Sequence, residues 1–214
     1  MKKFLALTLA VVMALLLVSC ASVPSNGDEQ QPDDSQKAPE LSRGTVSGDV
    51  YTSEYLGLSF TKPESWVYST DEEIAAAMNL GVDMFLGENF KNALENNPSI
   101  YDMMVVDTIT RSSINVGFEN LSKTFASNIT VEQYVEALKT QLGSISAMQV
   151  TFPETLATVK LGATEFTKVD CTVTVQGVSM KQVYYLNKAD NFMRFIIVTI
   201  PAGYTVAQIE AMFQ

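Results

Sequence analysis

The sequence predicts an α+β domain: a mainly antiparallel sheet flanked by helices on both faces, which is an α/β/α sandwich. Five segments between residues 148 and 200 have the composition of strands and are separated by Gly, Asn or Asp turns. The segment 192–200 is apolar on both faces except at Arg194 and Thr199, which predicts a strand in the middle of the sheet, covered on both sides. Three helical patterns with N-terminal capping signals can supply that cover.

The folded domain is expected to span residues 48–214 and to begin with two strands. Residues 50–53 and 58–61 are rich in β-branched and aromatic residues and are separated by a short turn. Pro63 then requires an extended or turning chain, and a short strand is expected at residues 67–68.

Each of the three helical patterns is introduced by a threonine and, three residues later, by a Glu or Gln that completes a capping box. The first pattern, at 74–94, is interrupted by Gly81 and Gly87, each costing about 1 kcal/mol relative to alanine. We therefore expect one broken helix or two short ones there. The second pattern, at 131–142, is expected to end with Gly143 at the C′ position. The capping pairs are Thr70 with Glu73, Thr130 with Gln133, and Thr205 with Gln208.

The remaining segments are read as strands. Residues 101–110 are largely apolar at first, and residues 113–119 alternate apolar and polar side chains, which predicts a half-buried antiparallel strand. Cys171 lies in the apolar phase of a later strand, where a free cysteine behaves as a small, inert hydrophobic side chain. The later strands are expected at 148–152, 157–161, 165–175, 179–186 and 192–200.

Composition excludes several classes of function. The chain has 14 basic and 24 acidic residues, a net charge of −10, which disfavours binding to nucleic acid phosphates. It has no histidine, so the commonest general base, the usual zinc ligand and every imidazole-dependent triad are missing. Neither a nucleophile elbow nor a phosphate-binding glycine loop is present. We therefore predict no catalytic residue, no cofactor and no metal site.

The first nineteen residues read as a secretory leader. Two lysines precede an apolar run from Phe4 to Val18, which is too short for a comfortable membrane span. The run ends in Leu17-Val18-Ser19-Cys20, which resembles the lipobox of bacterial lipoprotein precursors. This resemblance implies cleavage between Ser19 and Cys20, and acylation of the Cys20 thiol. The alternative is an ordinary signal peptide or an uncleaved anchor with a chance cysteine.

Residues 20–47 are expected to form a lipidated cysteine followed by a disordered acidic linker. The stretch is rich in Ser, Asp, Glu, Gln and Pro and has too little apolar surface to offset the chain entropy of folding. Two or three acyl chains on Cys20 would anchor the protein stably to the membrane. The chain is therefore expected on the extracytoplasmic face of a bacterial cell membrane, as a monomer.

The opening of the domain resembles that of PsbP-like domains. The resemblance is carried by residues 51–60, by Pro63 and Trp66 three residues later, by the late strand at 195–198 and by the closing helix. It implies an antiparallel sheet flanked by helices, no shared catalytic residues, and a role as an extrinsic or assembly subunit. The chain departs from photosynthetic members in its lipobox and its lack of histidine, so bacterial lipoproteins with this domain are the closer resemblance.

A partner or ligand surface is hypothesised at Trp66, Tyr68, Met84 and Phe85. Trp66 and the nearby tyrosines would offer an aromatic contact patch, although a tryptophan beside a proline turn is more often a plug at one end of a core. The glycine-interrupted segment around Met84 and Phe85 is the candidate for a mobile or partner-facing element. The acids at 71–73 favour the first turn of a helix over acid–base chemistry.

Three functions remain open, one of which is a purely structural or assembly role that rests on the family resemblance alone. The first is a non-catalytic, membrane-anchored module that binds an unknown protein, peptide or small envelope ligand. It predicts a pocket or apolar patch near residues 80–104, without converging ionisable groups. The alternative is a hydrolase of the cell envelope that uses carboxylates or a metal. It predicts that at least two of four acids meet in one cleft, namely Asp102, Asp107, Glu119 and Asp170.

Overall fold

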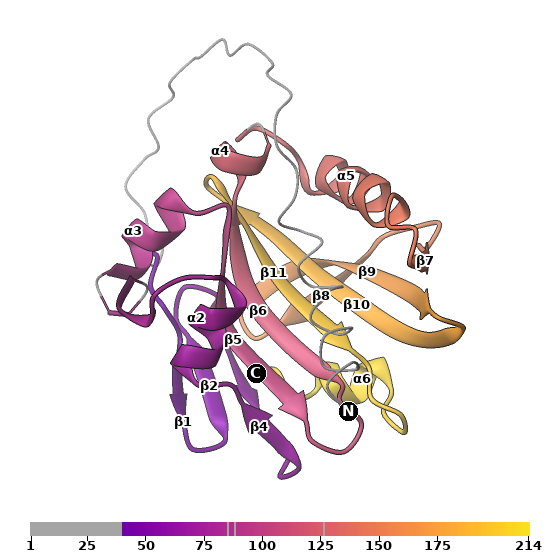
Figure 1. Cartoon of the computed structure of the whole chain (residues 1–214), viewed down its shortest axis with the longest axis horizontal. Coiled ribbons are helices and arrows are strands. Elements are labelled where there is room, and N and C mark those ends of the chain that lie inside the picture. Colours follow the sequence, from indigo (N-terminus) through magenta and orange to yellow (C-terminus); the bar gives the residue numbers. More distant parts are fainter. Residues whose placement is uncertain (1–39, 85, 88, 126) are drawn as a thin grey trace.

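Eight strands form one antiparallel sheet in the computed structural model, which describes residues 40–84, 86–87, 89–125 and 127–214. Every pairing in this sheet is antiparallel, as the sequence predicts (Figure 1). The strands follow one another in the order β4 (Trp66–Tyr68), β5 (Ser99–Asp107), β6 (Ser113–Asn120), β11 (Phe192–Thr199), β10 (Val178–Ala189), β9 (Thr164–Val175) and β7 (Met148–Thr151), and β8 (Ala157–Leu161) also pairs with β9.

A second sheet contains three strands, β1 (Thr45–Ser47), β2 (Val50–Ser53) and β3 (Leu58–Thr61). The strand β1 lies inside the range predicted to be linker, so the folded region begins before residue 48. A two-residue turn at Gly48 and Asp49 joins β1 to β2, and Gly48 has the positive φ of 59° that this tight hairpin requires. The linker prediction was wrong at residues 45–47, because it relied on their polar composition and not on the short hairpin pattern of residues 45–52.

The three predicted helical regions are confirmed, and each is capped as expected. Thr70, Thr130 and Thr205 all form complete capping boxes. Gly143 differs from the prediction, since it is the last residue of its helix and Ser144 is the C-cap with a right-handed φ of −77°. The first region is broken, as expected. The helices are α2 (Asp71–Ala77), the 3-10 turn η2 (Val82–Met84), α3 (Asn89–Asn96), the unpredicted short α4 (Leu121–Thr124), α5 (Val131–Gly143) and α6 (Val206–Glu210).

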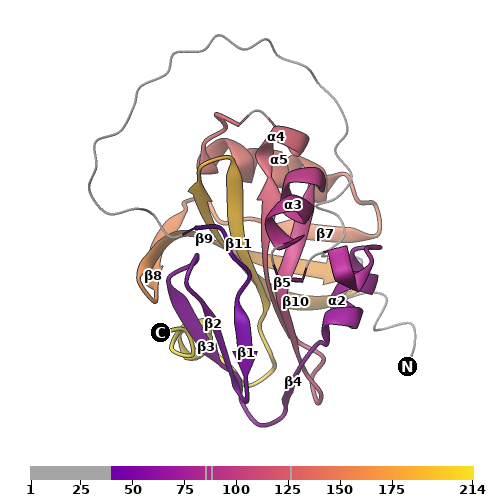
Figure 2. The same ribbon diagram turned by 90° about the vertical axis from the view of Figure 1, so that its left-hand side faces the viewer.

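Neighbouring residues of β6 show what covers each face of the large sheet. The Phe118 ring lies 5.5 Å from that of Tyr55, in the turn between β2 and β3. The next residue, Glu119, accepts a hydrogen bond from Tyr134 of α5. Because adjacent residues of a strand point to opposite faces, the small sheet and α5 cover opposite faces of the large one (Figure 2).

This layering corrects two predictions. The structure is an α+β fold with antiparallel sheets, but one face of the large sheet is covered by the small sheet together with α3, where helices alone were expected. Phe90 of α3 packs against Phe118 with ring centroids 5.8 Å apart. On this face Phe213, which follows α6, forms an antiparallel bridge to Phe60 of β3. In addition, β6 is buried on both faces except at Ser113, whereas alternation predicted one exposed face. Alternating polarity cannot distinguish a solvent-facing side chain from a polar one that is buried with a partner.

Candidate functional site

A pocket of about 440 Å³ lies where the chain before β1 crosses β5 and the start of α2. Three separate parts of the sequence meet in it: residues 43–46, residues 68–74, and two residues of β5. Ionisable side chains converge in this pocket beside open space. The lining residues are Arg43, Gly44, Thr45, Val46, Tyr68, Ser69, Thr70, Asp71, Ile74, Asp102 and Met103.

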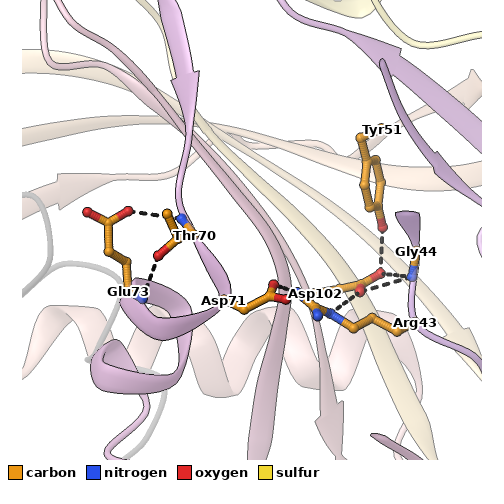
Figure 3. A network of polar contacts seen from close by, with 7 residues as sticks. All are labelled: Arg43, Gly44, Tyr51, Thr70, Asp71, Glu73 and Asp102. Atoms are coloured by element: carbon orange, nitrogen blue, oxygen red, sulfur yellow. Dashed lines mark hydrogen bonds and ion pairs between the residues drawn. The ribbon is translucent and has the colours of Figure 1, made fainter. Parts of the chain in front are cut away.

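A β-bulge brings Asp102 to this pocket. The register between β5 and β6 shifts between Tyr101 and Met103, so Asp102 is the extra residue in the pairing. The bulge directs a carboxylate from an apolar strand toward the small sheet. There it accepts a hydrogen bond from the Tyr51 hydroxyl at 2.6 Å and the Gly44 N–H at 3.0 Å from each carboxylate oxygen (Figure 3).

Arg43 links this carboxylate to helix α2. One guanidinium nitrogen lies 2.5 Å from the Asp71 carboxylate, and Nε lies 3.6 Å from that of Asp102 (Figure 3). The Asp102 side chain is fully buried, whereas the Asp71 side chain is 43% exposed. Arg43 therefore bridges a buried acid and a solvent-accessible one at the mouth of the pocket.

Gly44 is required by this arrangement because the backbone passes close to an aromatic ring. A Cβ at residue 44 would overlap the Tyr51 ring, so a larger residue could not keep the N–H within reach of Asp102. The hydrogen bond and the close approach together fix the start of β1 against β5. The glycine is explained by packing, since its φ is not in the left-handed region.

Burial controls the ionisation of the site. It raises the pKa of Asp102 from 3.8 to about 6, although the hydrogen bonds from Tyr51 and Gly44 and the charge of Arg43 act in the opposite direction. Burial, together with the adjacent carboxylate, also raises the pKa of Tyr51 well above 10. At neutral pH the site therefore holds a neutral phenol that donates to a predominantly ionised, desolvated carboxylate.

The first turn of α2 forms one wall of the pocket. Thr70 accepts a hydrogen bond from the Glu73 N–H, and the Glu73 carboxylate accepts one from the Thr70 N–H at 2.9 Å. Glu73 thus serves the helix cap, as its position in the sequence predicts. Asp71 serves a second purpose that the sequence did not indicate, because it pairs with Arg43.

The hypothesised surface residues have different environments. Trp66 is fully buried and its ring lies 6.5 Å from that of Phe60, so its assignment to a contact surface is wrong and the core-plug interpretation is confirmed. Tyr68 is half-buried and lines the pocket, with its hydroxyl donating to the backbone oxygens of Asp49 and Phe60 at 3.2 and 3.3 Å. Met84 ends η2, and Phe85 lies outside the described residues. Ser19 and Cys20 also lie outside them.

The four acids of the hydrolase hypothesis occupy separate places. Asp107 accepts hydrogen bonds from Ser65 and Thr110 in a turn, and Asp170 pairs with Lys181 at 3.1 Å. Glu119 lies beneath α5, bonded to Tyr134, and Asp102 is in the pocket. The structure therefore does not bring two of these four acids together in one cleft.

Other features of the described residues also bear on function. A second hollow of about 370 Å³ is lined by Asp83, Asn89, Asn92, Ala93, Asn96 and Asn97. Within residues 40–214, apart from the three undescribed positions, no group of three or more Cys, Asp or Glu side chains is arranged to hold a metal. Cys171 is buried, and burial raises its pKa to about 12. None of the helices in the described part of the chain is sufficiently long and apolar to cross a membrane.

Arg43, Gly44 and Asp102 were not identified from the sequence as parts of one site. The first two were assigned to the linker, and Asp102 was considered only as a possible catalytic acid. A usable signal was present, because Thr45-Val46-Ser47 and Val50-Tyr51-Thr52 flank a Gly-Asp pair, which is a β-hairpin pattern. The hollow lined by residues 83–97 lies within the range 80–104 where the binding hypothesis expected a pocket, and Asp83 is its one ionisable lining residue. The pocket at Asp102 reaches that range only at Asp102 and Met103 and does contain converging ionisable groups.

Comparison with known proteins gives structural neighbours only. No protein-family model matches the chain, and no curated protein matches its sequence. The neighbours include the solution structure of cyanobacterial PsbP (CyanoP) from Synechocystis sp. PCC 6803, with 12% identity, a TM-score of 0.46, and coverage of 85% of this chain and 97% of that one. They also include a crystal structure from Bacteroides thetaiotaomicron VPI-5482, with 12% identity, a TM-score of 0.36, and coverage of 80% and 47% respectively. Neither similarity bears on what this chain binds.

Proposed function

We propose that this chain is a lipid-anchored bacterial lipoprotein with a PsbP-like domain, and that it is a non-catalytic module which binds an envelope partner or ligand in the Arg43–Asp102 pocket. The observation that carries the binding role is the buried Asp102 carboxylate beside open space, linked through Arg43 to the more exposed Asp71. A perturbed, desolvated acid in a pocket is typical of a functional site, because burying a charge costs stability that packing alone would avoid.

The position of the pocket also supports an envelope role. It is built in part by residues 43–46, which directly follow the predicted linker. A partner bound there would contact the domain at the point where the membrane tether enters it. The lipobox at residues 17–20 supplies the proposed anchor.

Metabolic labelling with an alkyne-bearing fatty acid tests the anchor. We expect the wild-type chain to incorporate the label and to sediment with membranes, and the Cys20→Ser variant to lose both properties. Cys171→Ser is the matched control, because it removes the other cysteine and should change neither. Labelling that persists in Cys20→Ser would refute the anchor.

Photo-crosslinking in intact cells tests the binding role. A benzoylphenylalanine placed at Thr45, on the exposed rim of the pocket, should give one defined adduct, whereas the same group at exposed Thr158 of β8 should not. The double variant Arg43→Ala, Asp102→Asn should abolish the adduct while the protein remains folded. An equal pattern of adducts from both positions would argue against a site at this pocket.

A further inference from the structure

Two open sheet edges flank the pocket. The strand β1 is the terminal strand of the three-stranded sheet, and β4 is the terminal strand of the eight-stranded sheet. Val46 of β1 and Tyr68 of β4 both line the pocket, and Figure 2 shows β1 on the side of its sheet toward β4 and α2. An edge strand presents unpaired backbone groups to any chain that lies beside it.

The hydrogen-bond pattern gives the direction of these groups on β1. The Asp49 C=O accepts from the Lys62 N–H at 2.9 Å, so Asp49 and, by alternation, Tyr51 turn toward β3. Val46 lies opposite Tyr51 and must therefore turn its own N–H and C=O away from β2. Gly44, two residues earlier on the same edge, follows the same alternation, since its N–H reaches outward to β5. Among the described residues, the backbone groups of Val46 have no partner.

The same reasoning applies to β4. The Ser69 N–H donates to the Met104 C=O at 2.8 Å, and the Thr108 N–H donates to the Ser65 C=O at 3.1 Å. Ser65 and Ser69 therefore face β5, and Tyr68 faces away from it. The pocket is thus bordered by outward-facing backbone groups from two different sheets.

Charge at the pocket indicates the chemistry of a partner. Its lining residues that carry charge are Arg43, Asp71 and Asp102, which leave one negative charge in excess when both acids are ionised. The whole chain has a net charge of −10. The Asp71 carboxylate is sufficiently exposed to receive a basic group, and the Val46 side chain is 51% exposed beside it.

We propose that the pocket binds an extended peptide segment, which pairs with the outer edge of β1 and directs a basic side chain to Asp71. This inference rests on the proposed function and names its ligand class. Strand addition would satisfy the Val46 N–H and C=O, since main-chain hydrogen bonds provide the affinity in this mode and side-chain pockets provide the specificity. The basic side chain would add the charge complementarity that favours association with an acidic surface.

Peptide selection on the full chain, purified in mild detergent, tests the proposal. A random twelve-residue library displayed on phage is the probe, and the affinity of a selected synthetic peptide is then measured by calorimetry. We expect selected peptides to contain Lys or Arg among β-branched residues. The variant Val46→Pro, which removes one outward N–H, should weaken binding at least tenfold. The matched control Thr158→Pro, at an exposed position of the edge strand β8, should leave the affinity unchanged.

Methylation of the peptide's own amides provides a test that does not depend on the folding of a variant. Methylating the alternate amides that face β1 should abolish binding of the peptide to the wild-type chain. Methylating the amides that face away from β1 should leave the affinity unchanged. Equal tolerance of both sets, or wild-type affinity in Val46→Pro, would overturn strand addition. Self-association of the chain that Val46→Pro abolishes would overturn it too, in favour of a second copy as the occupant. If these outcomes occur while the Thr45 crosslink persists in cells, the binding role stands and only the peptide class fails.

Discussion

Replacing Asp102 with Asn should remove a large part of the pH dependence of stability. In the unfolded chain this carboxyl group titrates at its usual pKa of 3.8, and in the folded protein burial raises the pKa to about 6. A raised acid pKa means that the folded state prefers the protonated form. The stabilising contribution is therefore complete below pH 3.8 and is lost as the pH rises through about 6.

The size of the effect follows from the two pKa values. A difference of about 2 pKa units corresponds to about 3 kcal/mol, at 1.36 kcal/mol per unit. Asn cannot ionise, yet its side-chain oxygen can still accept the Tyr51 hydroxyl. The free energy of unfolding of the wild type minus that of Asp102→Asn should consequently fall by about 3 kcal/mol between pH 3.5 and 7.5.

Urea denaturation followed by circular dichroism, at several pH values across this range, measures that difference. Asp71→Asn is the control, because it removes the other partner of Arg43 at a side chain that is 43% exposed. Exposed ion pairs contribute about 0–1 kcal/mol, so this variant should lose no more than that at any pH in the range. A difference for Asp102→Asn that stays constant within about 1 kcal/mol, or rises with pH, would refute the reasoning.

Three further predictions concern packing, capping and reactivity. Trp66→Ala should lower the free energy of unfolding, measured in urea, by about 3–5 kcal/mol because the side chain is fully buried. Val67→Ala, at a half-exposed position, should lower it by under about 1 kcal/mol. Similar losses for the two variants would place Trp66 outside the core. Thr70→Ala should lower the free energy of unfolding by about 1 kcal/mol, measured by the same urea denaturation. Thr70→Ser should largely preserve it, since the serine hydroxyl can accept a hydrogen bond from the Glu73 N–H. Equal losses for the two variants would show that the cap does not act through the hydroxyl. In a Cys20→Ser chain, Cys171 should resist a thiol reagent in the folded state and react fully in guanidinium, because it is buried with its pKa raised to about 12; fast labelling of the folded protein would contradict this.

Local features were predictable because each depends on residues a few positions apart. All three capping boxes and the strand β8 lie where the sequence placed them. The break between α2 and α3 was expected at Gly81 and Gly87, but α2 already ends at Ala77, and Asn79 just beyond it has a left-handed φ of 54°. Prediction was weaker where one local sequence pattern is compatible with two different structures. Residues 45–47 are polar enough to suggest a linker, but as β1 they pair with β2.

The site could not be predicted because its parts meet only in the folded chain. Asp102 bonds to Gly44 and Tyr51, which lie 58 and 51 positions away in the sequence, and a bulge in β5 is needed to direct it there. Nothing near Asp102 in the sequence specifies that register shift, since it arises from pairing with β6.

The antiparallel strands, the capped helices and the prediction of a lipidated Cys20 could be read from short-range patterns of polarity and shape. Which faces of these elements are covered depends on packing between distant parts of the chain. Packing buries Trp66 and the polar side of β6, places a second sheet beside α3 on one face, and brings Arg43, Asp71 and Asp102 together around one pocket. The physical reason is that burial and charge pairing are properties of surfaces brought together by packing, and local sequence does not specify which surfaces meet.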